Sequence, residues 1–234
     1  MTTKPLRLVL LGAPGSGKGS FASVIAPHFN IPTISTGQLI RDELKQGTEL
    51  GKSLAAITAS GSFVSDDIVL GLLKQRLAQD DCQNGFILDG FPRTLEQATA
   101  LAQFVDITFA LQFILPYSVI TQATAGRRSC AQCAHGYNIA DIDCDGIKMP
   151  PLLPKVANTC DKCGANPIVL EQRADDKEDI VKHRLEVYDK LTVPILDLYR
   201  SQNKLVSHNV KNGKRDWQNT NLKEILENEV KSRQ

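Results

Sequence analysis

The chain has 234 residues, a length that suits one sizeable α/β domain carrying one or two small insertions. Its 27 basic and 26 acidic side chains give a net charge of +1, so composition offers no basis for a nucleic-acid-binding or membrane-binding surface. No signal-like stretch opens the chain and no apolar run reaches the length of a membrane span, so we expect a soluble, cytoplasmic protein with no membrane partner.

Short apolar runs alternate along the chain with segments of helical spacing. This alternation predicts an α/β protein with a mainly parallel sheet, whose ligands lie beyond the carboxyl ends of the strands. Strands are expected over 7–11, 86–88, 107–115 and 204–208. Helices are expected over 18–29, over 37–46 after an N-cap at Ser35 or Thr36, from Asp66 or Asp67 to about 77, over 94–104, over 175–201 with an interruption at Pro194, and over 217–230.

The pattern breaks between about 129 and 167, where Cys, Gly, Pro, Asn and Asp crowd together without a sustained period. Two Cys-x-x-Cys pairs lie in this stretch, at Cys130 and Cys133 and at Cys160 and Cys163. Four thiolates at this spacing favour a structural Zn²⁺ site, although disulfides or free thiols are the alternatives. Cys144, between the pairs, is a surplus thiol or an alternative ligand.

A glycine-rich loop, Gly12-Ala-Pro-Gly-Ser-Gly-Lys-Gly-Ser20, follows the first expected strand and opens a helix. Backbone N–H groups and a helix N-terminus converge on phosphate oxygens in this setting, and Lys18 adds a positive charge. The alternative is a glycine turn that only joins a strand to a helix. The hydroxyl comes one residue later than in the general phosphate-loop pattern, at Ser20.

Two arginines stand next to backbone turns downstream of this loop. Arg41 follows Ser35-Thr36-Gly37, and Arg93 follows Asp89-Gly-Phe-Pro after a buried strand. Guanidinium groups in such places suit two-pronged phosphate binding. On its own, Arg41 could equally be an exposed helix residue paired with Asp42 or Glu43.

Taken together, the phosphate loop, the Ser-Thr-Gly segment with Arg41, and Asp89-Gly-Phe-Pro-Arg93 with Gln97 resemble the adenylate kinase family over about residues 7 to 201. The resemblance implies the P-loop nucleoside monophosphate kinase fold: one core domain over 1–234, an AMP-binding segment over 35–64 and a zinc-binding lid over 127–168. The implied reaction is reversible Mg²⁺-dependent phosphoryl transfer from ATP to AMP, giving two ADP, by an enzyme that is a monomer in this family.

The resemblance also assigns residues. The implied catalytic residues are Lys18, Arg93, Arg127, Arg173 and Arg184, and Asp89 would orient Mg²⁺ through water. The implied ATP-binding residues are Gly15, Ser16, Gly17, Lys18, Gly19, Ser20 and Arg127. The implied AMP-binding residues are Thr36, Arg41, Ser62, Phe63, Val64, Gly90, Phe91, Pro92, Arg93, Gln97, Arg173 and Arg184. Asp175 matches an acid at the lid hinge, and zinc would be held by Cys130, Cys133, Cys160 and Cys163.

Two positions depart from the family pattern. Ala123 replaces an arginine that stacks on the donor adenine in many members, and Gln38 stands where an acid is common. From Ala123 we hypothesise weaker discrimination among ATP, GTP and other donors. The alternatives are a GTP:AMP phosphotransferase and a nucleotide-gated zinc-knuckle binding module, although the neutral charge and the few aromatics near the cysteines disfavour the latter.

Overall fold

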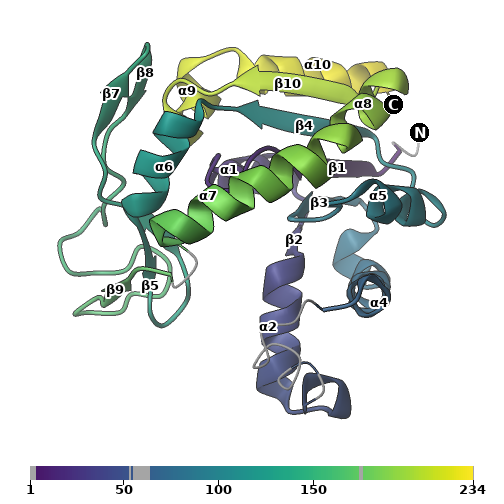
Figure 1. Ribbon diagram of the computed structural model, residues 1–234, viewed down its shortest axis with the longest axis horizontal. Helices are drawn as coiled ribbons and strands as arrows, with labels where there is room; N and C mark the ends of the chain where they lie inside the picture. Colours follow the sequence, from purple (N-terminus) through teal and green to yellow (C-terminus); the bar gives the residue numbers. More distant parts are fainter. Residues whose placement is uncertain (1–3, 53, 55–63, 174–175, 234) are drawn as a thin grey trace.

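A five-stranded parallel sheet forms the centre of the protein in the computed structural model, which describes residues 4–52, 54, 64–173 and 176–233. The strand order is β10-β4-β1-β3-β2, and every neighbouring pair is parallel. Figure 1 shows the strands in this order, from β10 at the top of the view to β2 below. The strands are β1 (Leu6–Leu11), β2 (Thr33–Ser35), β3 (Gly85–Asp89), β4 (Phe109–Ile114) and β10 (Leu205–Asn209).

The central strand β1 is apolar on both faces because helices cover both sides of the sheet. Leu8 and Leu10 point into one core cluster, which includes residues of α1 and α10. Val9 and Leu11 point into the other, which includes residues of α4, α5 and α8. The continuous apolar run in the sequence is thus explained by a strand buried on both sides.

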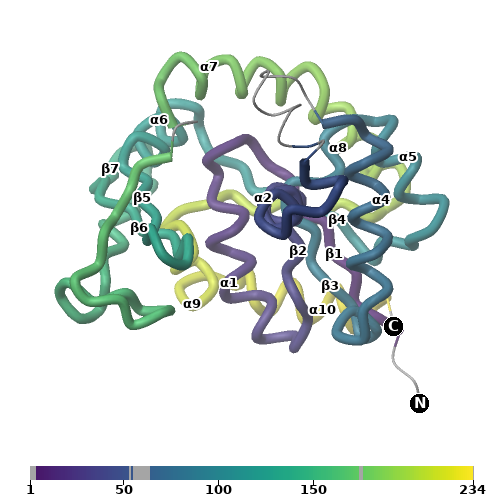
Figure 2. The backbone as a smooth tube through the Cα atoms, turned by 90° about the horizontal axis from the view of Figure 1, so that it is seen from below, coloured from purple at the N-terminus to yellow at the C-terminus, as the bar shows by residue number. Residues whose placement is uncertain are grey.

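Helices fill the connections between the strands, and their bounds largely confirm the predicted periodicity. Figure 2 shows α7 running across one end of the molecule, from α6 towards α8. The helices are α1 (Lys18–Phe29), α2 (Thr36–Gln46), α4 (Asp66–Leu77), α5 (Leu95–Ala102), α6 (Tyr117–Ala125), α7 (Glu178–Val187), α8 (Val193–Ser201), α9 (Asp216–Asn219) and α10 (Leu222–Arg233). Short 3₁₀ turns cover Asp80–Cys82 and Gly213–Arg215.

Residues 127–171, called the insertion below, form short antiparallel strands instead of continuing the α/β pattern. Strand β5 pairs with β6 and β9, and β7 pairs with β8 in a separate hairpin. In Figure 1 the insertion lies to the left of the sheet, whereas α2 projects downward from the edge strand β2. Its strands are β5 (Arg127–Cys130), β6 (Gly136–Asn138), β7 (Ile142–Cys144), β8 (Ile147–Met149) and β9 (Leu170–Glu171).

Three local predictions need correction or completion. Ser65, and neither Asp66 nor Asp67, is the N-cap of α4, because both acids already lie in its first turn. The single closing helix expected over 217–230 is wrong: α9 ends at Asn219, and Thr220 is extended before α10 begins. The interruption expected near Pro194 is confirmed as a π-helical turn over Tyr188–Thr192, after which the proline lies in the first turn of α8.

Candidate active site

The glycine loop joins β1 to α1 at the carboxyl edge of the sheet. Gly12, Gly15 and Gly17 all have positive φ, at 142°, 89° and 88°. At Gly15 a Cβ atom would lie 2.4 Å from the Oγ1 of Thr124 on α6, so only glycine fits between the loop and that helix. The loop therefore presents backbone, and the start of α1, to the open end of the sheet.

Lys18, the first residue of α1, closes the loop from within. Its Nζ donates to the carbonyls of Gly12 at 2.7 Å and Ala13 at 3.0 Å. Burial lowers the pKa of Lys18 from 10.5 to about 8, although the negative charge of Asp89 opposes this change. The ammonium is thus held in place by the loop, and an anion that binds next to it would stabilise its charged form strongly.

Three arginines from distant parts of the chain act on Lys18. Arg93, Arg184 and Arg127 each lower its pKa further through their positive charges, in this order. They come from the turn after β3, from α7 and from the start of β5. Lys18 and these three arginines, gathered near Asp89 at the carboxyl edge of a parallel sheet, form a site for a polyanion.

Two hydroxyl groups lie buried against the glycine loop. Within the part of the chain that the structure describes, neither Ser16 Oγ nor Thr124 Oγ1 has a hydrogen-bond partner. Both side chains are almost fully buried, at 1% and 3% exposure. Unpaired buried hydroxyls are costly and uncommon, so the loop retains hydrogen-bonding capacity that a bound ligand or an ordered water can satisfy.

A second cluster lies where β2 and β3 end. The Oγ1 of the buried Thr36 donates to the carbonyl of Gly90 at 3.1 Å, and Arg93 Nε donates to the same carbonyl at 2.7 Å. Gln97 then accepts from the backbone N–H of Arg93 at 2.7 Å and donates to Asp66 at 2.6 Å. The sequence segments around Thr36 and Arg93 are therefore joined in one network at the carboxyl ends of β2 and β3.

Gln38 explains how Arg41 is held. Its Oε1 accepts from Arg41 Nη2 at 2.8 Å and from Nε at 3.3 Å, while its Nε2 donates to Asp42 at 2.7 Å. The amide thus orients the guanidinium without adding a charge. Of the other predicted residues nearby, Val64 is half-buried before α4, whereas Ser62 and Phe63 lie outside the described residues.

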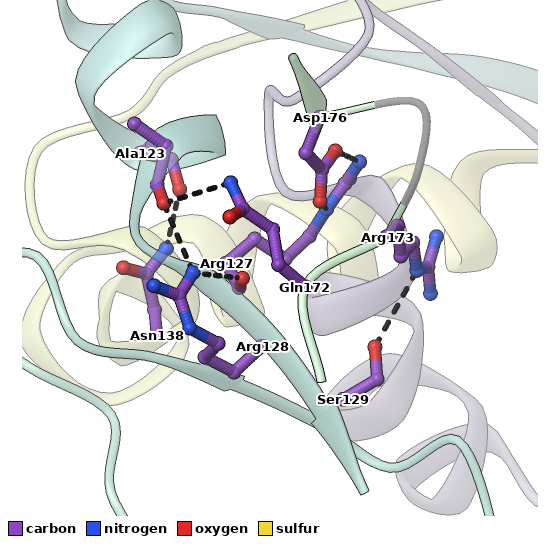
Figure 3. A network of polar contacts seen from close by, with 9 residues as sticks. Ala123, Arg127, Arg128, Ser129, Asn138, Gln172, Arg173 and Asp176 are labelled. Atoms are coloured by element: carbon purple, nitrogen blue, oxygen red, sulfur yellow. Dashed lines mark hydrogen bonds and ion pairs between the residues drawn. The ribbon is translucent and has the colours of Figure 1, made fainter. Parts of the chain in front are cut away.

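Arg127 is paired with an acid that the sequence interpretation had not singled out. Its Nε donates to Asp176 Oδ2 at 2.9 Å and its Nη2 contacts the other carboxylate oxygen (Figure 3). The Asp176 side chain is fully buried. Asp175, favoured from the sequence, lies outside the described residues; the only signal for Asp176 was its place in the Arg-Ala-Asp-Asp run.

Arg173 turns towards the insertion: its Nε donates to Ser129 Oγ at 3.4 Å (Figure 3). Ala123, on α6, lies close by and is 9% exposed. Its carbonyl accepts a 2.7 Å hydrogen bond from Asn138 Nδ2 of β6. The insertion thus packs on α6 at Ala123, the position where many members of the family that this chain resembles carry a stacking arginine.

The four cysteines of the two pairs converge within the insertion, with all four Sγ atoms within 4.8 Å of one another. The Sγ distances are 3.8 Å from Cys130 to Cys163 and 3.6 Å from Cys133 to Cys160. A tetrahedral site with Zn–S bonds of about 2.3 Å requires sulfur separations of about 3.8 Å, so the cluster fits zinc. Cys144 is outside the cluster and packs against the main core.

The two cysteine pairs are built alike. Ala134 N donates to Cys130 O at 2.8 Å, and Gly164 N donates to Cys160 O at 3.0 Å; both residues have positive φ. Backbone N–H groups of Cys163 and Lys162 lower the pKa of the Cys160 thiol, whereas burial raises the pKa of the Cys133 thiol. Tyr137 Oη also donates to Cys160 Sγ at 3.6 Å.

Comparison with known proteins gives one consistent result. A family model described as adenylate kinase matches residues 10–204. The chain is 44% identical over 207 residues to an adenylate kinase of Trichlorobacter lovleyi, covering 86% of this chain and 91% of the relative. Adenylate kinases of Fervidobacterium nodosum and Caldicellulosiruptor bescii are 41% and 42% identical, covering 86% of this chain and 88% and 90% of theirs.

Proposed function

We propose a residue-level scheme for phosphoryl transfer in this chain, which belongs to the adenylate kinase family and is a nucleoside monophosphate kinase. It transfers a phosphoryl group reversibly between ATP and AMP, giving two ADP, and so maintains the balance of adenine nucleotides. The observation that carries the scheme is the convergence of Arg93, Arg127 and Arg184 on Lys18 beside Asp89.

The donor phosphates lie on the glycine loop in this scheme. Backbone N–H groups from Gly15 to Ser20 bind the phosphate oxygens, and Lys18 neutralises charge where the transferred group leaves. The geometry that supports this is the positive φ of Gly15, where the loop backbone carries no side chain, and the ammonium held by two loop carbonyls. Arg127, held by Asp176, reaches the donor from the insertion side.

The acceptor AMP lies on the opposite side, over the ends of β2 and β3. Arg41 and Arg93 bind its phosphate, and Thr36, Val64 and Gln97 contact its base. The proposed pocket is completed by Ser62, Phe63, Gly90, Phe91 and Pro92. Arg173, from the segment before α7, and Arg184, from α7, also contact AMP. The network from Thr36 through Gly90 to Arg93 and Gln97 supports a preformed site.

The transfer needs no general base in this scheme, because the acceptor is already a phosphate oxygen anion. Catalysis then consists of aligning the two phosphates in line and neutralising the charge that builds up between them. Lys18, Arg93, Arg127, Arg173 and Arg184 supply that neutralisation. Asp89 is the residue that would hold Mg²⁺ through water, and the ion would offset the negative charge of the phosphate groups.

Zinc has a structural role in this proposal, because four cysteine ligands leave no open position for a substrate. The ion would be held by Cys130, Cys133, Cys160 and Cys163, and would thereby join the two Cys-x-x-Cys turns. The segment 127–168 then forms the lid over the donor, and 35–64 the AMP-binding segment, both inserted in one core domain. Covering the bound nucleotides with these two segments excludes water and prevents hydrolysis of ATP.

The helices and the cysteines bear on where the enzyme works in the cell. None of the helices in the described residues has both the length and the apolarity to cross a bilayer. All six cysteines are free thiols, which suits a reducing compartment, and we propose a cytoplasmic monomer without a nucleic-acid partner.

A coupled assay of ADP formation tests the scheme. ADP should form from AMP with Mg²⁺ and ATP, and Lys18→Ala should abolish formation. Faster turnover with GTP than with ATP would favour a GTP:AMP phosphotransferase, for which the small Ala123 is the relevant observation. Retention of nucleic acid without turnover of AMP would favour a binding module.

A further inference from the structure

The hairpin β7–β8 lies in the middle of the insertion, yet it packs on the main domain. Ile142 and Ile147 are 2% and 4% exposed and belong to the core cluster that contains Phe113, Val119 and Val210. Figure 1 shows the hairpin beside α6 and α9, away from β5 and β9. The insertion is therefore fixed to the core by its central hairpin as well as by its two ends.

A second contact joins this hairpin to residues 211–216, called the docking loop here, which connect β10 to α9. The backbone N–H of Lys148 donates to Lys211 O at 2.7 Å. Arg215 extends two prongs of its guanidinium, donating from Nη1 to Pro150 O at 3.1 Å and from Nη2 to Pro151 O at 3.3 Å. These carbonyls belong to prolines at the end of the hairpin, so one side chain holds two consecutive peptide units.

The docking loop is itself held by one buried carboxylate. Asp216 has no exposed side-chain surface and accepts hydrogen bonds from His208 Nε2, Lys211 N and Asn212 N, each at 2.8 Å. A fourth comes from Asn212 Nδ2 at 3.3 Å. A buried carboxylate is tolerated only when its oxygens are saturated in this way, so the loop has little freedom to adopt another shape.

The docking loop also faces the second cysteine pair. Lys214 lies close enough to Asp161 and Lys155 to interact with both electrostatically. Asp161, which follows Cys160, accepts from the backbone N–H of Lys155 at 2.9 Å. One short loop therefore contacts the hairpin and also carries a charge that acts on the segment next to the second cysteine pair.

We propose that Arg215 and Asp216 are positioning residues for the donor side of the reaction: they hold the hairpin so that the insertion, with Arg127 at its start, is placed over the phosphate loop. This inference rests on the proposed function. Asp216 shapes the docking loop, and Arg215 fastens the hairpin to it. Because the proposed AMP site lies over the ends of β2 and β3, at the opposite edge of the sheet from β10 and the docking loop, the contact acts on the donor and on water exclusion, and leaves AMP binding alone.

Arg215→Ala in the zinc-loaded full chain is the direct test, since it removes both hydrogen bonds and leaves the core intact. We expect the KM for ATP to rise about threefold to tenfold, the equivalent of one to two ordinary hydrogen bonds, while the KM for AMP is unchanged. ATP hydrolysis per ADP-forming turnover should rise, and amide exchange should increase over 140–151 but not over 85–89. Arg215→Lys, which keeps the positive charge but not the planar guanidinium, should retain part of the wild-type behaviour and show a smaller rise in the KM for ATP.

Arg200→Ala is the matched control, because it removes an exposed arginine paired with Asp197 on α8. It should change neither KM. If Arg215→Ala raises both KM values equally, or speeds amide exchange over 140–151 without changing the KM for ATP, the contact is merely structural and the proposal is wrong. If the unmodified chain forms no ADP, the proposed function itself fails, whatever the exchange data show about the docking loop.

Discussion

Arg127 and Asp176 lie 49 positions apart in the chain and form a two-point ion pair in which the carboxylate is completely buried. The pair joins the first strand of the insertion to the segment that leads into α7. It thereby fixes the direction of a guanidinium that also acts electrostatically on Lys18. In the proposed scheme, a charge that acts on the reacting phosphates is thus oriented by an acid that does not contact them.

Removing the Asp176 carboxylate should therefore impair catalysis through Arg127. We expect Asp176→Ala to lower kcat at least about tenfold, because a misdirected guanidinium loses at least about 1.4 kcal/mol of transition-state stabilisation. Steady-state kinetics with both substrates provide the measurement. Asp197→Ala, which breaks only an exposed pair with Arg200, is the control and should have no effect. Equal kcat values for both variants would contradict the role of the pair.

Arg41 should serve AMP alone. Replacing it by alanine removes a two-pronged contact to phosphate, and the KM for AMP should rise by at least about tenfold with the KM for ATP unchanged. Arg41→Lys should recover only part of the affinity because lysine lacks the planar fork. Lys45→Ala, in the last turn of the same helix, controls for the loss of a nearby charge. A parallel rise in both KM values would show that the effect is general.

The lowered pKa of Lys18 should make donor capture depend on pH. The ammonium is present below about pH 8 and is lost as the pH rises through that value. We expect kcat/KM for ATP at low AMP to fall above about pH 8, while kcat holds to higher pH because bound phosphates raise the pKa again. A decline of both parameters at the same pH would exclude Lys18 as its cause.

The lowered pKa of Lys18 should also make the free energy of unfolding depend on pH. Its folded pKa lies below the unfolded value, so the unfolded chain binds more protons between about pH 8 and 10.5, and the contribution of Lys18 to stability rises over that window. Urea unfolding at several pH values checks the sign.

Replacing one of the four clustered cysteines should abolish the proposed zinc binding, whereas replacing a cysteine outside the cluster should not. Cys133→Ser should lower the zinc content from about one ion per chain to near zero and lower the melting temperature of the insertion. Cys144→Ser is a matched control in the same insertion, because its sulfur lies outside the cluster. Metal analysis and amide exchange over 130–165 provide the measurement. Retained zinc in Cys133→Ser would overturn the assignment of the ligands.

An arginine at position 123 should sharpen donor choice. If a stacking cation is what this chain lacks, Ala123→Arg should shift the ratio of kcat/KM values for ATP and GTP towards ATP by about 2-fold to 30-fold. Ala123 is buried beneath Asn138, so the added bulk also presses on the insertion. Ala123→Leu measures that pressure without a cation. An unchanged ratio in Ala123→Arg would refute the hypothesis of weak discrimination.

Local sequence determined much of the framework. The apolar run at Leu8 to Leu11 and the periodicity of α1 come from short-range preferences, and the glycine loop between them has its conformation built into residue type. The cysteine spacing likewise predicted a four-sulfur cluster, because each pair folds as its own tight turn. The π-helical turn after α7 and the split before α10 were harder to place, since several helical geometries suit the same periodicity.

What only the tertiary structure decided are contacts between residues far apart in the sequence. Nothing near Arg127 indicates that Asp176 will bury its carboxylate against it, and nothing near Ile147 indicates that the middle of an irregular insertion packs on α6 and the docking loop. Local preferences act over a few residues, whereas the partner of a buried charge or an apolar hairpin is set by the whole fold, which must saturate the one and cover the other.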